Sequence, residues 1–137
     1  MAPHREGPTL EDMSIPDRPH LVPGPDHPIG ISPSNTRVVV TAGDDTVADS
    51  TRALRLQEAS YPAVHYLPPD SVNWDVLQRT DTHTYCPYKG EASYYSVRTP
   101  EGTVEDAAWT YEDPFPEVAP IARYLAFYPD RVTVTAE

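Results

Sequence analysis

The sequence of 137 residues contains one cysteine, one lysine and no long apolar run. A single cysteine excludes a disulfide within the chain and excludes zinc sites built from several cysteines. Because no run reaches about 18 apolar residues, we expect no membrane-spanning segment. The N-terminus also lacks the cationic start and apolar core of a signal peptide. These absences predict a cytoplasmic protein with no membrane partner.

Positive charge is scarce as well. Ten Lys and Arg stand against 21 Asp and Glu, which gives a formal net charge of −11. Nucleic-acid binding needs clustered cations that neutralise phosphates, and the arginines here are scattered along the chain. We therefore expect no nucleic-acid partner. A local cationic spot would still suffice to hold a small anion, and the general acidity favours solubility.

Proline, in contrast, is abundant, with 17 residues. That number excludes a helical bundle, because proline removes a backbone donor and breaks helix interiors. Eight of the prolines fall in residues 1–35, where periodic apolar residues are absent. Such a segment favours extended conformations and cannot bury enough surface to fold alone. We predict a proline-rich arm over 1–35, extended or partly disordered, and a single β-rich globular domain over 36–137.

The globular part is a succession of short apolar stretches separated by turn residues. These stretches predict strands over 37–42, 46–51, 64–67, 80–85, 91–98, 104–111, 124–128 and 131–135. Residues 52–58 fit a strand or a helical turn, and nearby Pro62 favours the strand. Helical turns are expected after a cap at Asp70 or Ser71, and over 117–123. The predicted fold class is mainly β: a small single-domain barrel or sandwich of short antiparallel strands, with one or two short helices.

The stretch Thr84-Tyr85-Cys86-Pro87-Tyr88-Lys89-Gly90 contains both the only cysteine and the only lysine. Strand-like sequence runs into it and out of it. We predict a five-residue loop from Cys86 to Gly90, in which Gly90 supplies a positive φ where the turn requires one. Such a loop would project one thiol and one ammonium from a β-scaffold.

These motifs also support a family resemblance. The matching residues are Val47-Ala48-Asp49-Ser50-Thr51-Arg52-Ala53-Leu54, Glu58, Tyr66-Leu67-Pro68, the string Thr84–Gly90, Ala108-Trp109, Tyr111, Pro114 and Leu125-Ala126-Phe127-Tyr128. From about Arg37 to Val134, the chain resembles the bacterial family known as domain of unknown function 427, which is sometimes labelled nucleotidyltransferase-like. The resemblance implies a compact β-rich domain without an established activity, and the arm falls outside it.

Cys86 and Glu58 are the candidate catalytic residues. A thiolate at Cys86 near Lys89 or His83 would be a nucleophile or redox centre, whereas a buried free cysteine usually acts as a small hydrophobe. Burial of Glu58 would raise its pKa and suit it to acid–base chemistry. The alternative for Glu58 is a salt bridge to an arginine such as Arg55.

Metal and cofactor sites are poorly supported. His83 and Cys86, even with His65, make a poor ligand set for zinc. A nucleotidyltransferase needs carboxylates that hold Mg²⁺, and the nearest pattern is Gly43-Asp44-Asp45 with Asp49. Gly-Asp-Asp between two strands is better explained as a hairpin turn. We expect no metal and no cofactor.

The candidate ligand-binding residues are the cations Lys89 and Arg52 and four aromatic residues, Tyr66, Tyr88, Trp109 and Tyr111. The cations would contact an anionic group, and the aromatic rings would line a pocket or pack in the core. The leading hypothesis is a domain that binds a small anionic ligand at the Cys86–Gly90 loop. One alternative is an enzyme, thiol-dependent or nucleotidyltransferase-like. Another is a homo-oligomeric module, such as a homodimer, that uses the arm. Whether the protein is an enzyme stays open.

Overall fold

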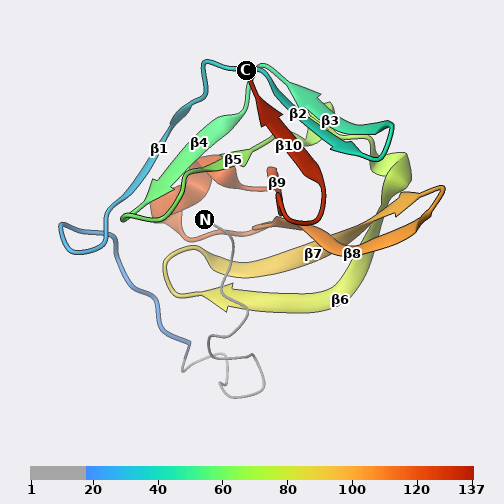
Figure 1. Ribbon diagram of the computed structural model, residues 1–137. Helices are drawn as coiled ribbons and strands as arrows, with labels where there is room; N and C mark the ends of the chain where they lie inside the picture. The colour runs from blue at the N-terminus through green and yellow to red at the C-terminus, as the bar shows by residue number, and fades with distance from the viewer. Residues whose placement is uncertain (1–17) are drawn as a thin grey trace.

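The computed structural model describes residues 18–137, and its strands form three antiparallel sheets (Figure 1). Their orders are β1-β4-β5, β10-β2-β3 and β6-β7-β8-β9. The strands are β1 (Ile29–Pro33), β2 (Val38–Ala42), β3 (Asp45–Ser50), β4 (Leu54–Glu58), β5 (Val64–Tyr66), β6 (Leu77–Cys86), β7 (Gly90–Thr99), β8 (Gly102–Thr110), β9 (Leu125–Phe127) and β10 (Thr133–Ala136). The predicted mainly β fold is confirmed. The described strands pack as a sandwich and do not close into a barrel.

Strands β2 and β3 form the predicted hairpin, with Gly43 at φ +60° in its turn. On β2, Val38 and Val40 point inward and are fully buried, as expected of alternate residues on a half-buried strand. The last strand, β10, pairs with β2 on the edge that does not face β3. Isolated pairing of Ala48 with Val72 joins the β10-β2-β3 sheet to the segment that enters β6.

The β1-β4-β5 sheet settles the ambiguous segment 52–58 as a strand. Leu54 and Leu56 of β4 lie on one face, and Leu56 is fully buried. Strand β1 pairs along the whole of β4, from Ile29 opposite Glu58 to Pro33 opposite Leu54. The sheet therefore begins inside the segment assigned to the arm. Residues 1–17 of that arm lie outside the described part of the chain.

The β6-β7-β8-β9 sheet carries the predicted cysteine loop at one end. Cys86 pairs directly with Gly90, so the connection consists of three residues rather than the five predicted. Gly90 has a φ of +110°, which confirms the positive φ predicted for it. Glycine reaches this region without steric cost because it has no Cβ. The turn is thus tighter than its sequence indicated.

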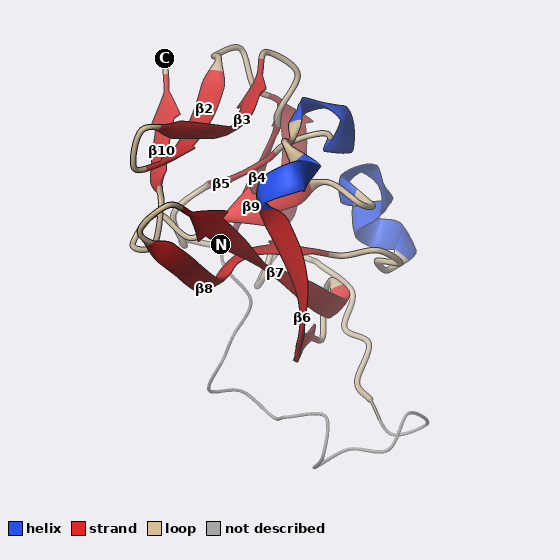
Figure 2. Cartoon of the chain, turned by 90° about the vertical axis from the view of Figure 1, so that its right-hand side faces the viewer, coloured by secondary structure: helices blue, strands red, loops and turns tan. Residues whose placement is uncertain are grey.

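All of the described helices are short 3₁₀ turns, and they gather on one side of the molecule (Figure 2). They are η3 (Pro69–Ser71), η4 (Trp74–Val76) and η5 (Pro116–Ile121). The predicted cap at Asp70 or Ser71 was wrong. Both residues lie inside η3, where Pro68 and Pro69 fix the backbone and no side chain caps the turn. The Asn73 side chain instead caps η4 by accepting a hydrogen bond from the Asp75 backbone.

Two clusters of buried side chains make up the core. The first lies between the β10-β2-β3 sheet and the long sheet, and includes Val38, Val40 and Leu125. The second, here called the tyrosine cluster, contains Leu56, Tyr66, Cys86, Ala92, Tyr94, Trp109, Tyr111, Val118, Ile121, Ala126 and Tyr128. Alternation along β8 divides the two, since Ala108 belongs to the first cluster and Trp109 to the second.

The backbone at Gly90 gives a testable prediction. Gly90→Ala is expected to lower the free energy of unfolding by about 1–3 kcal/mol, because φ +110° is strained for any residue with a Cβ. Urea denaturation measures the change. The matched control is Gly30→Ala, at an exposed strand position with open space around it, which should stabilise by about 0.5–1 kcal/mol. Equal effects of the two substitutions would contradict the prediction.

Candidate functional site

The structure brings together seven of the eight residues that the sequence singled out. Cys86, Tyr66, Trp109 and Tyr111 belong to the tyrosine cluster, and Tyr88 packs against it. Glu58 and Lys89 are bonded to each other, and the Lys89 ammonium lies 5.9 Å from the centre of the Tyr111 ring. The eighth residue, Arg52, lies apart on an exposed connection. The sequence prediction therefore identified one spatial cluster, although it did not say what holds the cluster together.

The centre of this region is a buried ion pair between Glu58 and Lys89. The Lys89 Nζ donates to Glu58 Oε1 at 2.5 Å, and the two side chains are 0% and 1% exposed. Strand β4 supplies the carboxylate and the turn after β6 supplies the ammonium. Burying either charge alone would be costly, so each requires the other. Glu58 pairs with Lys89, and not with Arg55 as the sequence had suggested.

The end of the arm covers this ion pair. His27 Nε2 lies 2.7 Å from Glu58 Oε2, and because an ionised carboxylate only accepts, the imidazole is the donor. The same imidazole stacks on the Tyr88 ring, with the two ring centres 4.0 Å apart. Upstream, the Leu21 backbone donates to the Pro87 carbonyl at 2.9 Å. The arm thus lies along the Pro87–Lys89 turn of its own domain (Figure 1).

Opposing effects act on the pKa of Glu58. Burial favours the neutral acid and would raise the pKa. The Lys89 ammonium opposes burial through its charge and hydrogen bond, His27 adds to it, and the net result is a pKa below the usual range. Glu58 is therefore an ionised partner of Lys89, which agrees with the salt-bridge alternative except in the identity of the cation, and a catalytic role for Glu58 stays a prediction.

The other predicted residues are enclosed. Cys86 is 2% exposed and lies among aromatic side chains, which matches the small-hydrophobe alternative for its role. Tyr66 accepts a hydrogen bond from Trp109 Nε1 at 3.2 Å, and burial raises the pKa of its hydroxyl. Burial likewise raises the pKa of Tyr111, whose hydroxyl has no hydrogen-bond partner among the described residues.

Arg52 does not join this cluster. Its guanidinium donates two hydrogen bonds to the Asp70 carboxylate at 2.8 Å, and its side chain is 65% exposed. Lys89 is fully buried against Glu58. An anion clamp that uses Lys89 and Arg52 together is thus inconsistent with this arrangement, because each cation already has a carboxylate partner and the two face different surroundings.

The candidate metal ligands also lie apart. Within residues 18–137, no group of three or more His, Cys, Asp or Glu side chains is arranged to hold a metal ion. Asp44 lies in the β2–β3 turn and Asp45 begins β3, whereas Asp49 binds Arg37 through two hydrogen bonds of 2.8 and 2.5 Å. Gly43-Asp44-Asp45 is a hairpin turn in the structure. None of the described helices is long and apolar enough to cross a membrane.

A hollow with an apolar lining, here called the apolar hollow, lies between β5 and β10 and measures about 470 Å³. Its lining comprises Pro62, Ala63, Val64, His65, Leu67, Trp109, Phe127, Pro129, Val134 and Ala136. Of these, only Trp109 was predicted to contact a ligand. The other lining residues lie in segments without a recognisable sequence motif. Only the alternating apolar residues of the last strand indicated, in the sequence, that these side chains share a face.

His65 is the one ionisable residue in that lining. It is half-buried on β5 and lies opposite Arg55 of the neighbouring strand. Burial, reinforced by the Arg55 charge, lowers the pKa of the imidazole. At neutral pH the ring is uncharged and offers one donor and one acceptor. The apolar hollow therefore has a neutral lining.

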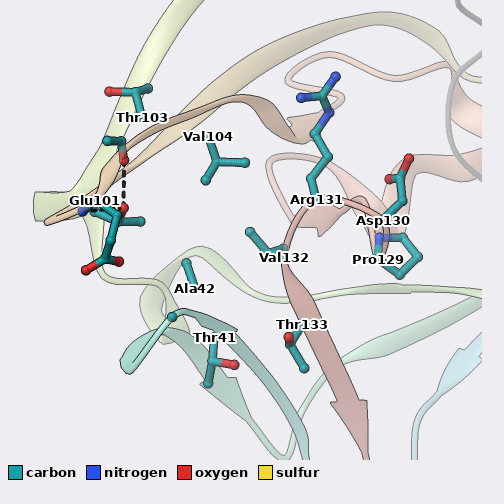
Figure 3. A pocket seen from close by; sticks show the side chains of 13 residues that line it. Thr41, Ala42, Glu101, Thr103, Val104, Pro129, Asp130, Arg131, Val132 and Thr133 are labelled. Atoms are coloured by element: carbon teal, nitrogen blue, oxygen red, sulfur yellow. Dashed lines mark hydrogen bonds between the residues drawn. The ribbon is translucent and has the colours of Figure 1, made fainter.

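A second, polar hollow of about 460 Å³ lies where three turns meet (Figure 3). Glu101, Asp130 and Arg131 are its charged residues. Glu101 lies in the β7–β8 turn, whereas Asp130 and Arg131 are neighbours in the turn between β9 and β10. Figure 3 shows the Arg131 guanidinium pointing away from the Glu101 carboxylate. Because its charged side chains do not converge on one point, this surface gives less basis for recognition than the apolar hollow.

Comparison with known protein families gives one match. A family model described as Domain of unknown function (DUF427) matches residues 30–137, which is most of the chain. The chain belongs to the DUF427 family. The match begins within β1, in agreement with the pairing of that strand with β4. No curated protein matches the sequence.

The ion pair gives the second prediction. Lys89→Met is expected to lower the free energy of unfolding by about 3–5 kcal/mol, because it leaves the Glu58 carboxylate buried without its ammonium. In a double-mutant cycle with Glu58→Gln, the double variant should lose less than the sum of the single variants. The control is Arg52→Gln, which removes an exposed ion pair and should cost at most about 1 kcal/mol. A Lys89→Met effect no larger than the control would contradict the prediction.

The lowered pKa of Glu58 gives the third prediction. A carboxyl whose folded pKa lies below its unfolded value, near 4.5, stabilises the fold above that pH and loses this contribution as the pH falls through the folded pKa. The stability difference between the wild type and Glu58→Gln should therefore be constant near neutral pH and shrink below about pH 4.5. Urea denaturation from pH 7 to pH 3 measures it. A difference that stays constant over this range would argue against an ionised Glu58.

Proposed function

We propose that this DUF427 domain is a small-molecule-binding protein whose ligand is neutral and largely apolar and occupies the apolar hollow between β5 and β10. This proposal rests on one observation, a concave space of about 470 Å³ with an almost wholly apolar lining. Small-molecule sites typically measure roughly 300–1,000 Å³ and combine an apolar lining with a few polar groups. The apolar hollow agrees with both criteria.

The floor of the apolar hollow is rigid, which favours binding. Trp109 is 1% exposed, and its indole is held by the hydrogen bond to Tyr66 and by the Tyr128 ring, 4.5 Å away between centres. A fixed floor reduces the ordering cost of binding, because its rotamer is already determined. The hollow is bordered by β5 and β10, which belong to different sheets.

The chemistry of the lining defines the ligand class. A charged ligand would lose its hydration without gaining a counter-charge, because His65 is neutral at pH 7 and the remaining lining side chains are apolar. A neutral ring system with one hydrogen-bonding group directed at His65 would pair with the imidazole and contact the apolar side chains with the rest of its surface. The proposal keeps the small-ligand hypothesis but moves the site away from the Cys86–Gly90 loop. There Lys89 is matched by Glu58, which leaves an anion no unpaired cation.

The remaining hypotheses receive less support. An enzyme that uses the Cys86 thiol has no accessible nucleophile, since Cys86 is 2% exposed. The contacts of His27 and Leu21 with the domain's own turn favour an arm that completes this domain over an arm that joins two copies. Homodimerisation stays a prediction, which the effect of arm deletion on the oligomeric mass would test.

Titration with N-phenyl-1-naphthylamine, a neutral apolar fluorophore, tests the proposed function. Trp74→Phe leaves Trp109 as the sole tryptophan of this two-tryptophan chain. We expect saturable binding, with energy transfer from Trp109 to the probe because the indole forms the floor. Ala136→Trp, at an exposed position of the lining, should weaken binding about tenfold or more by filling the space.

Thr135→Trp is the matched control. It places the same side chain one residue away on β10, at an exposed position that does not line the apolar hollow. Its affinity for the probe should equal that of the parent. Absence of saturable binding, or equal weakening by the two tryptophan substitutions, would overturn the proposal.

A further inference from the structure

A smaller hollow borders β8 at Thr110. It measures about 150 Å³, and its lining consists of Pro69, Trp74, Tyr95, Thr110, Glu112, Arg123 and Leu125. Because one water occupies about 30 Å³ in the liquid, this space equals about five waters and is large enough for a single ring. We refer to it as the Thr110 hollow.

Thr110 lines this hollow and carries an unused hydrogen-bonding group just beneath its wall. The residue is 2% exposed, and its Oγ1 has no hydrogen-bond partner among residues 18–137. Thr110 pairs with Leu125 of β9, and one register step away Ala108 pairs with Tyr95 of β7. Cross-strand partners and alternate residues share a face, so the Thr110 side chain lies on the same face as Tyr95 and Leu125. A buried hydroxyl without a partner costs free energy unless some group pairs with it.

The aromatic wall of the hollow is fixed in orientation. Trp74 is 42% exposed, although tryptophan is a large apolar residue. Its Nε1 donates to the Pro69 carbonyl at 2.9 Å, and its ring meets the Tyr95 ring at 74° with 5.4 Å between centres. These two contacts hold an indole face at the surface, where it is available to a flat apolar group.

The charges around the hollow leave one cation unmatched. Arg79 binds both oxygens of Glu112 at 2.9 Å, so these two charges compensate each other. Arg123 is exposed and takes part in none of the salt bridges formed within the described chain. Glu112 is the only carboxylate of the lining. The lining itself carries one negative and one positive charge, on Glu112 and Arg123. Because Arg79, outside the lining, compensates Glu112, the Arg123 guanidinium is the charge left for an anion.

From this combination we infer that the Thr110 hollow is a second binding site, specific for a small organic carboxylate with a flat apolar body. The Arg123 guanidinium binds the carboxylate, the Thr110 hydroxyl donates to one of its oxygens, and the Trp74 and Tyr95 rings contact the apolar body. Guanidinium and hydroxyl donors form stronger hydrogen bonds with an ionised acceptor than with a neutral one. The site therefore selects an anion where the apolar hollow selects a neutral molecule.

Titration of the ¹⁵N-labelled full chain with benzoate tests this inference, and benzamide serves as the neutral probe of the same shape. The readout is the indole N–H resonance of Trp74, which is assigned by its loss in Trp74→Phe. We expect saturable shifts with benzoate and at least about tenfold weaker binding of benzamide, because a hydrogen bond to a charged partner exceeds a neutral one. Arg123→Gln should weaken benzoate binding to a similar extent.

Thr110→Val separates a binding role from a structural one. It removes a hydroxyl that has no partner, so it should leave the free energy of unfolding unchanged or increased, while it weakens benzoate binding about tenfold. The matched control is Arg131→Gln, an exposed arginine of the polar hollow formed by the three turns, which should bind benzoate like the parent.

Three results would overturn the inference: no saturable shift with benzoate, equal affinity for benzamide, or equal weakening by Arg131→Gln and Arg123→Gln. Binding of the naphthylamine probe in the apolar hollow should be unaffected by Arg123→Gln and Thr110→Val. The two sites can therefore fail independently.

Discussion

The buried ion pair between Glu58 and Lys89 connects three distant parts of the chain. It joins β4 of one sheet to the turn between β6 and β7 of another, and through His27 it also holds the arm. Because neither charge is stable alone in this environment, the pair requires both sheets to take one relative position. The tyrosine cluster packs beside the pair.

This constraint explains the composition of the Cys86–Gly90 segment. Lys89 must reach inward across a three-residue turn, and Gly90 allows the backbone to turn sharply enough with its positive φ. The Phe115 backbone donates to the Lys89 carbonyl, so the segment after β8 also holds the turn. The residues that most resemble an active site in the sequence are, in three dimensions, the structural centre of the domain.

The hollows proposed as binding sites lie outside this centre but depend on it. Strand β8 contributes Trp109 to the lining of the apolar hollow and Thr110 to that of the smaller one. Trp109 is fixed by Tyr66, a member of the same tyrosine cluster as Cys86. The apolar hollow has a neutral lining, whereas the smaller one includes the exposed guanidinium of Arg123, so one strand borders two different recognition surfaces. Rigid packing of the centre holds both surfaces in shape.

Much of the fold could be predicted from the sequence because local patterns determine it. The consecutive β-branched residues Val38, Val39 and Val40 predict a strand, and the Gly-Asp-Asp turn predicts its hairpin. The positive φ of Gly90 follows from its place in a tight turn. The sequence singled out Glu58, Tyr66, Trp109 and Lys89 as candidate site residues. It did not indicate that they form a structural cluster around an ion pair.

What the sequence alone determined is the strand content, most of the hairpins and the importance of the Cys86–Gly90 turn, because these depend on neighbours in the chain. Only the tertiary structure decided that Lys89 faces Glu58 rather than a ligand, since 31 residues separate the two. The same holds for the apolar hollow, which is lined by β5, β8, β9 and β10 together. A single strand has no signal for such a space, because the space exists only between elements that packing has brought together.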